Sequence, residues 1–443
     1  MSEETREEKM NVKLVFYIGL AFFTTGISWG LYDTQVNLAL NDYFLGVLLI
    51  VGFWMALDNI IGVIIQPIMG SISDNTRSRF GRRTPYIIIG VIFSAIFFAL
   101  IPTGFGTELW ILLLWMFLFG ISMGFYRSQA VALMPDFIKP ANRSKANAII
   151  NLMGGVGAIV AFGLSGLGDI LGFQNIFILV SLIMLVALCI FLWKVKETES
   201  YSYQLLLEKE AAHTTETESP KIGIMQSINE IMQEDDKSTL FMLLAIFSWF
   251  VGYQGVQSLF TIYATNEDLL NLTPGMAGFM LIFVALPFIL FALPAGIIAT
   301  KIGRKKTIKI GLIIMAFSLI IGTILVQTLK AEGIGIFIVI MIFLGVGWAL
   351  VNVNSIVIIW ELAPTIEKIG AYTGLYYFFS VLAAILGPMI VGGITDIIGV
   401  AYLLVSAAIF LIIAFVFILF VKRGEIELTE EEKLLRKRAI QEL

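Results

Sequence analysis

Charged residues are scarce within the long apolar segments of this sequence, and the few that occur there are the first candidates for chemistry. Asp58 lies near the middle of one segment, Arg127 in the second half of another, and Asp33 near the end of a third. A charge in a bilayer interior costs at least about 2.5 kcal/mol on insertion scales, so a charge kept there indicates a function. We expect Asp58 and Arg127 to face one cavity, where protonation of Asp58 would couple proton entry to binding. A permanent structural ion pair is the alternative.

Amide and aromatic side chains form a second set of candidates, for binding a polar solute. Neutral hydrogen-bond partners and aromatic faces are what a small polar molecule such as a sugar needs of its binding site. Helical spacing places four such side chains between 249 and 257 on one face. For each aromatic, core packing or a place at the membrane interface explains the residue equally well. The predicted substrate-binding residues are Gln35, Asn37, Asn59, Gln129, Trp249, Tyr253, Gln254, Gln257, Asn352, Asn354 and Tyr376.

Long apolar helices must position these side chains. The 443 residues are 58% hydrophobic and 14% charged, whereas soluble proteins are roughly 25% charged. Because about 20 helical residues cross a hydrocarbon core, the apolar runs predict an all-α integral membrane protein with twelve transmembrane helices. No short alternating segments of the kind that build a membrane barrel occur. The predicted spans are 14–38, 44–69, 86–102, 109–134, 148–171, 176–193, 240–264, 276–299, 307–326, 334–359, 369–394 and 401–421.

The spans divide the chain into two bundles with polar segments around them. We predict a tail at 1–13, a six-helix bundle at 14–193, a linker at 194–238, a second six-helix bundle at 239–421 and a tail at 422–443. Nearly all Lys and Arg lie in the tails and in alternate loops, which places both termini in the cytoplasm. The N-terminal tail lacks a signal-peptide pattern. We expect a multi-pass protein of the cell membrane, in a bacterial host because the loops are compact.

The two bundles repeat each other at an offset of 224 to 227 residues. The segment 70–74 matches 296–300, and 165–172 matches 392–399, where the glycines and one aspartate, Asp169 or Asp396, recur. An offset of six spans gives both repeats the same membrane orientation, around an axis along the membrane normal. Two parallel halves around a central cavity is a transporter architecture.

The loop after the second helix of each half resembles a known signature. The stretch Gly296 to Lys306, with Gly303-Arg304-Lys305-Lys306, resembles that of the major facilitator superfamily. The longer copy at 70–85, Gly-Ser-Ile-Ser-Asp-Asn-Thr-Arg-Ser-Arg-Phe-Gly-Arg-Arg-Thr-Pro, resembles the sucrose/proton symporters of the SLC45 type and, less closely, the glycoside-pentoside-hexuronide cation symporters. The resemblance implies two pseudo-symmetric six-helix bundles that work by alternating access. Its conformational switch motif would comprise Gly70, Asp74, Arg77, Gly81, Arg82, Arg83, Gly296, Gly303 and Arg304.

The coupling ion is predicted from a difference within this resemblance. In glycoside-pentoside-hexuronide symporters, acidic residues one turn apart before a proline form a sodium site. Here Gln66 and Gly62 stand at those places before Pro67, and the acid Asp58 is a further turn away. We therefore expect protons rather than Na⁺ as the coupling ion.

Taken together, these patterns predict a secondary active transporter, a proton-coupled symporter of a sugar or glycoside. An exporter of amphiphilic compounds and a non-transporting membrane sensor are the alternatives. The chain has no Walker loop, one histidine (His213, in the linker) and one cysteine (Cys189, in a span), which argues against an enzyme, a metal and any other cofactor. We expect a small-molecule solute and the lipid bilayer as partners, no nucleic acid, and a monomer.

Overall fold

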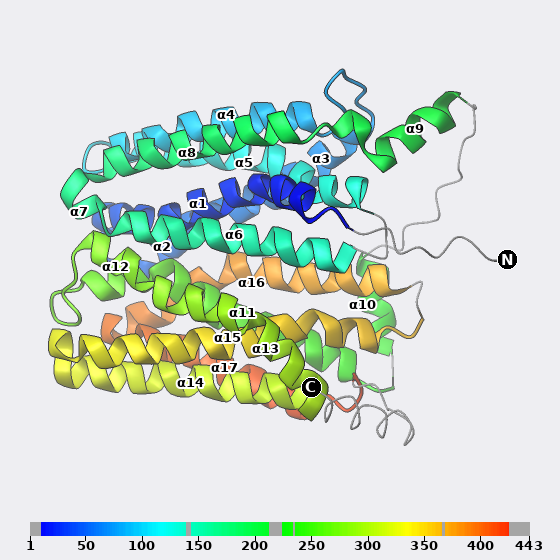
Figure 1. Cartoon of the computed structure of the whole chain (residues 1–443). Helices are drawn as coiled ribbons and strands as arrows, with labels where there is room; N and C mark the ends of the chain where they lie inside the picture. Colours follow the sequence, from blue (N-terminus) through cyan, green and yellow to red (C-terminus); the bar gives the residue numbers. More distant parts are fainter. Residues whose placement is uncertain (1–9, 139–142, 212–223, 234, 366–367, 425–443) are drawn as a thin grey trace.

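The computed structural model describes residues 10–138, 143–211, 224–233, 235–365 and 368–424, and Figure 1 shows the chain as a stack of long, roughly parallel helices. Twelve helical segments are long and apolar enough to cross a membrane, which confirms the predicted number of spans. The helices are α1 (Val12–Tyr43), α2 (Leu48–Met55), α3 (Leu57–Asp74), α4 (Thr84–Leu100), α5 (Leu109–Phe137), α6 (Arg143–Ser165), α7 (Gly168–Leu171), α8 (Phe173–Lys194), α9 (Tyr201–Ala211), α10 (Ile224–Gln233), α11 (Ser238–Thr265), α12 (Pro274–Met280), α13 (Ile282–Ile302), α14 (Arg304–Leu329), α15 (Ile334–Leu362), α16 (Ile369–Ile398) and α17 (Leu403–Leu419).

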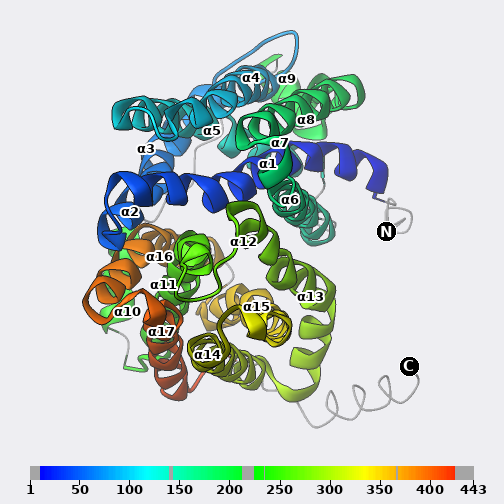
Figure 2. The ribbon, with the colours of Figure 1, turned by 90° about the vertical axis from the view of Figure 1, so that its left-hand side faces the viewer.

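The helices form two bundles, α1–α8 above and α11–α17 below in Figure 1. The segment between them contributes α9 and α10, which lie at the end of the molecule where α1 starts. We call this end the near face, and the opposite end, with α7 and the start of α12, the far face. Along the seam between the bundles, α1 packs on α11, α2 on α16, and α6 on α12 and α13, as Figure 2 shows from the far face.

The second span of each bundle is interrupted at matching positions of the repeat. Ala56 separates α2 from α3, and Leu281 separates α12 from α13. Each of these residues donates its backbone N–H to a carbonyl three residues back, so the helix is locally tighter but continues in the same direction. The break places Asp58 in the first turn of α3, deep within the span.

Small residues allow the helices within a bundle to approach closely. A Cβ on Gly26 of α1 would lie 2.0 Å from the carbonyl oxygen of Gly154 on α6, and one on Gly157 would lie 2.5 Å from that of Phe23. Gly157 thus lets α1 and α6 pack closely. Aromatic pairs fill the core behind them, with Phe98 and Phe177 stacked 4.5 Å apart between ring centroids.

Candidate functional site

Two carboxylates from different helices of the first bundle lie within electrostatic range of each other. Asp33 on α1 and Asp58 on α3 are both half-buried, and they lie close enough to repel electrostatically. Arg127 on α5 lies within electrostatic range of Asp58. Neither Asp58 nor Arg127 forms an ion pair with any residue that the structure describes, and Arg127 is exposed. The expectation that Asp58 and Arg127 face one cavity stays a prediction; in this conformation the two charges lie within electrostatic range and form no salt bridge with each other.

The side chains around these acids come from both bundles. The amide of Asn59 donates to Asp58 (3.2 Å), and the amide of Gln257, on α11 of the second bundle, donates to Asp33 (3.3 Å). Tyr32, which sequence reasoning missed, lies within electrostatic range of both acids. The acid of one bundle is therefore joined to an amide of the other.

The residues at this seam are related by the internal repeat. Asp33 and Gln257 are 224 residues apart, and so are Asn37 and Thr261, whose side chains are hydrogen-bonded at 2.8 Å. Residues at the same position of two repeats can meet only near the axis that relates the repeats. The carboxylate site therefore lies next to the pseudo-two-fold axis, where a carrier of this architecture binds its solute.

A cavity of about 190 Å³ opens beside Gln257. On one side its wall is the ring of Tyr253, stacked on Trp348 with the ring centroids 3.9 Å apart and the planes 6° from parallel. Sequence reasoning did not single out Trp348. The rest of the lining is apolar and comes from α6, α11, α13, α14, α15 and α17 and from Leu281, with Phe162 and Phe288 the largest side chains. The cavity thus combines one aromatic and amide wall with a hydrocarbon surface.

Several predicted binding residues bond other helices instead of facing the cavity. Gln35 is 3% exposed and donates to Ser165 and to the carbonyl of Pro274, and Asn37 is fully buried with the carbonyl of Ser258 as acceptor. Both side chains therefore join the bundles toward the far face. In this conformation both side chains bond groups at the seam between the bundles, which argues against their predicted place in the binding site.

Gln129 and Asn354 are a second correction. Each is almost completely buried and donates to a carbonyl on the second span of its own bundle, Met69 and Ala295 respectively. These two bonds occupy matching places in the repeat. The amides satisfy buried backbone groups between helices, and so they face away from the central cavity.

The remaining predicted residues divide between the core and the cavity surface. Trp249 is fully buried, and Tyr376 is 7% exposed with its hydroxyl 3.1 Å from that of Ser355, so both belong to the core of the second bundle. Gln254 and Asn352 are half-buried. Of the predicted binding residues, Asn59, Tyr253 and Gln257 are brought to the central site.

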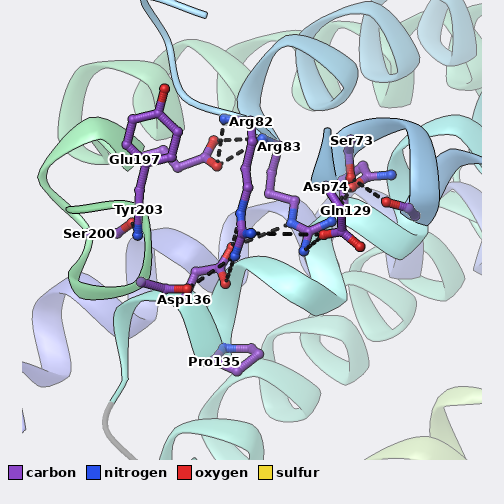
Figure 3. Close-up of polar contacts among 12 residues, drawn as sticks. Ser73, Asp74, Arg82, Arg83, Gln129, Pro135, Asp136, Glu197, Ser200 and Tyr203 are labelled. Atoms are coloured by element: carbon purple, nitrogen blue, oxygen red, sulfur yellow. Dashed lines mark hydrogen bonds and ion pairs between the residues drawn. The ribbon is translucent and has the colours of Figure 1, made fainter. Parts of the chain in front are cut away.

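The switch motif forms a compact charge cluster at the near face of the first bundle (Figure 3). Arg82 binds Asp136 with N–O distances of 2.6 and 3.3 Å, and Arg83 binds Asp74 at 2.6 Å and Asp136 at 3.4 Å. Gln129 accepts from Arg83 at 3.3 Å. The Asp74 carboxylate of the motif thus pairs with neighbouring guanidinium groups within its own bundle.

A buried glutamate that the sequence did not single out completes this cluster. Glu197, in the short turn after α8, is 1% exposed and caps the start of α4 (Figure 3). Its carboxylate accepts the backbone N–H groups of Arg82, Arg83 and Thr84 at 2.7 to 3.0 Å, and the Thr84 hydroxyl at 2.7 Å. Negative charge at a helix N-terminus is stabilising, and these donors have no partner within the helix. Glu197 thus ties the segment after the sixth span to the switch motif.

The second bundle carries a reduced copy of the cluster. Arg304 pairs with Glu361, at the places that Arg82 and Asp136 occupy in the first bundle. Gly81 and Gly303 have φ values of +106° and +94°, so both turns need glycine, as the motif predicts. A Cβ added to Gly70 or to Gly296 would meet no atom within 4 Å. Gly70 and Gly296 therefore make no close helix approach in this conformation, in which the contacts between bundles described above lie toward the far face.

The profile of the Major Facilitator Superfamily matches residues 18–269 and again 265–442, nearly the whole chain. The chain belongs to the major facilitator superfamily. This superfamily membership, together with the twelve spans, makes the protein a multi-pass membrane transporter of small molecules. Solved structures agree on the fold: a nucleoside transporter NupG covers 92% of this chain at 13% identity with a TM-score of 0.66, over its full length. A D-xylose-proton symporter covers 92% at 18% identity with a TM-score of 0.64, over 96% of its own length.

One curated protein resembles a part of this superfamily member. A lactose permease of Lactobacillus helveticus is 38% identical over 85 residues, which is 19% of this chain and 12% of that protein. The match therefore spans a small fraction of the length of that relative.

Proposed function

We propose that the protein is a proton-coupled symporter of a sugar or glycoside that works by alternating access in the cell membrane, with the near face cytoplasmic. The observation that carries the proposal is the juxtaposition of Asp33 and Asp58 beside Arg127 at the pseudo-two-fold axis. Two carboxylates that repel each other favour a state in which they hold one proton between them. The partial likeness to a lactose permease and the fold likeness to a D-xylose-proton symporter support a sugar.

The proposed coupling follows from the charges. With both acids ionised, Arg127 is attracted to Asp58. A proton on Asp58 removes that attraction and frees the guanidinium to donate to solute hydroxyls, while the bond from Gln257 links Asp33 to the second bundle. The stacked Tyr253 and Trp348 rings offer a flat apolar surface of the kind on which the C–H face of a sugar packs.

Uptake into proteoliposomes tests the proposal. Wild-type protein should accumulate at least one sugar or glycoside from a panel under an imposed proton gradient, and a sodium gradient alone should not drive it. Asp58→Asn should lose accumulation but retain exchange of labelled for unlabelled solute, because exchange needs no net proton movement. Asp268→Asn, at an exposed acid in the loop before α12, is the matched control and should behave as wild type. Proton-driven accumulation by Asp58→Asn at the wild-type level would refute the coupling role.

The apolar lining of the cavity favours a second candidate, an exporter of amphiphilic compounds. Apart from Tyr253, Gln257 and Trp348, the side chains around the 190 Å³ cavity are hydrocarbon, thioether or glycine. Such an exporter would move lipophilic fluorescent cations against a gradient and ignore sugars. Uptake of sugars without transport of such dyes decides for the symporter.

A further inference from the structure

The far face is closed by two carboxylates that the proposed coupling does not use. Asp169, in α7 of the first bundle, accepts the backbone N–H of Gly275 at 2.9 Å and the hydroxyl of Thr273, both at the start of α12 in the second bundle. The residue between them is Pro274, which has no N–H to donate. The carboxylate of one bundle thus satisfies the free donors at a helix start of the other bundle.

The same contact occurs in the opposite direction. Asp396, near the end of α16 in the second bundle, accepts the N–H groups of Leu48 and Leu49 at 2.8 and 2.9 Å, at the start of α2 in the first bundle. Both donors are orphan N–H groups of a first helical turn, so the bond is charge-assisted and favoured by the helix dipole.

The two contacts are copies of each other under the internal repeat. Asp396 follows Asp169 by the same number of residues as Gly275 follows Leu48. The residue one helical turn before each aspartate also contacts the same helix start of the other bundle. A Cβ on Gly392 would lie 2.6 Å from the carbonyl oxygen of Leu48. Ser165, at the matching place, donates its hydroxyl to the carbonyl oxygen of Gly275. A chance surface contact has no reason to appear twice at symmetry-related positions.

We infer that these two contacts, the far-face latches (Asp169 with Thr273 and Gly275; Asp396 with Leu48 and Leu49), hold the far gate shut and set the balance between the two orientations of the carrier. The inference rests on the proposed alternating access. Donor and acceptor belong to different bundles in both latches, so rocking the far ends apart must break both together. The lost bonds pass to water, since both carboxylates are already exposed to solvent. Asp169 and Asp396 are therefore positioning residues, which act on the gate without touching the solute.

The test follows opening of the far gate with a buried cysteine in protein reconstituted into lipid nanodiscs. Thr34 suits this purpose because it is fully buried, its hydroxyl bonds only a carbonyl of its own helix, and its Cβ lies beside Gly278 of the second bundle. In a Cys189→Ser background, Thr34→Cys should react with a soluble maleimide only when the gate opens. No solute and no proton gradient are needed, so the result is independent of the identity of the solute.

We expect Asp169→Asn and Asp396→Asn each to raise the labelling rate roughly threefold to tenfold, less than the roughly twelvefold or more of a hydrogen bond to a charged group away from solvent, because both acids are exposed. The double variant should show about the product of the two increases, since the latches share no partner. Asp268→Asn removes a far-face charge without a latch and should leave the rate unchanged. Labelling of both latch variants at the rate of this control would overturn the inference.

A second reporter separates gate opening from a loosened fold. Ser181, 5% exposed on α8 within the first bundle, has no hydrogen-bond partner for its hydroxyl among the described residues, and Ser181→Cys should label slowly in every variant. A rise at this position equal to that at Thr34→Cys would also overturn the inference. If the latch variants open the gate but the protein takes up no sugar of the panel, the inference about the latches holds and only the proposed substrate is refuted.

Discussion

Replacement of Glu197 by alanine is predicted to destabilise the first bundle. The carboxylate is 1% exposed and accepts three backbone N–H groups and one hydroxyl at the start of α4. Four hydrogen bonds to a charged group would be worth at least about 6 kcal/mol together. Water that enters the space left by alanine recovers part of this, so we expect a loss of about 3 kcal/mol in the free energy of unfolding.

The assay is thermal unfolding in detergent at one fixed heating rate, because the apparent melting temperature of a protein that unfolds irreversibly depends on that rate. A loss of about 3 kcal/mol lowers the melting temperature of a domain the size of one bundle by roughly 6 °C or more. The matched control is Glu199→Ala, two residues along the same turn, whose side chain is 69% exposed and pairs only with the exposed Lys196. That variant should lose less than about 0.5 kcal/mol. Equal melting temperatures for the two variants would refute the assignment of Glu197 as the cap of α4.

Two further predictions concern packing and pH. Gly26→Ala should sharply reduce the yield of folded protein in size-exclusion chromatography, because the new Cβ would lie 2.0 Å from the Gly154 carbonyl oxygen. Gly70→Ala should not reduce the yield, because its Cβ would meet no atom within 4 Å. Equal yields for the two variants would contradict the packing of α1 on α6. Asp236 accepts from the hydroxyl and N–H of Ser238, which lowers the pKa of its carboxyl below the ordinary 3.8. A lowered pKa stabilises the fold at neutral pH and ceases to do so as the pH falls through the folded-state pKa, so Asp236→Asn should lower the melting temperature at pH 7, and its difference from wild type should shrink as the pH falls below 3.8. A difference that does not shrink there would argue against it.

The fold was predictable from the sequence because each span is specified locally. Twenty apolar residues must form a helix in a bilayer wherever they occur, and the offset between repeats relates the bundles without any knowledge of contacts. The glycines at the matching places 81 and 303 were likewise predictable locally, because each lies in a turn that only glycine adopts readily.

The site was predictable only in part. An acid such as Asp58 is recognisable in the sequence through its cost in the membrane, whatever it faces. A neutral amide has no comparable cost of insertion that would mark it as functional. Because every neighbouring residue is apolar, the sequence does not show whether an amide faces the cavity or another helix. Gln35, Asn37, Gln129 and Asn354 were accordingly assigned to a cavity, although they bond backbone and interface groups. Glu197 was missed because its partners lie more than 100 residues away in the sequence.

The bond between Asp33 and Gln257 has a consequence for the origin of the two halves. In a dimer of two identical six-helix chains, a residue on the axis meets its own copy across an isologous interface. An aspartate at this position would then face an aspartate, and two ionised groups would oppose the assembly. Fusion of the two copies into one gene releases each position to mutate alone, and an amide opposite the acid turns that repulsion into a hydrogen bond. A single acid on the axis is therefore available only to a carrier whose halves are no longer identical.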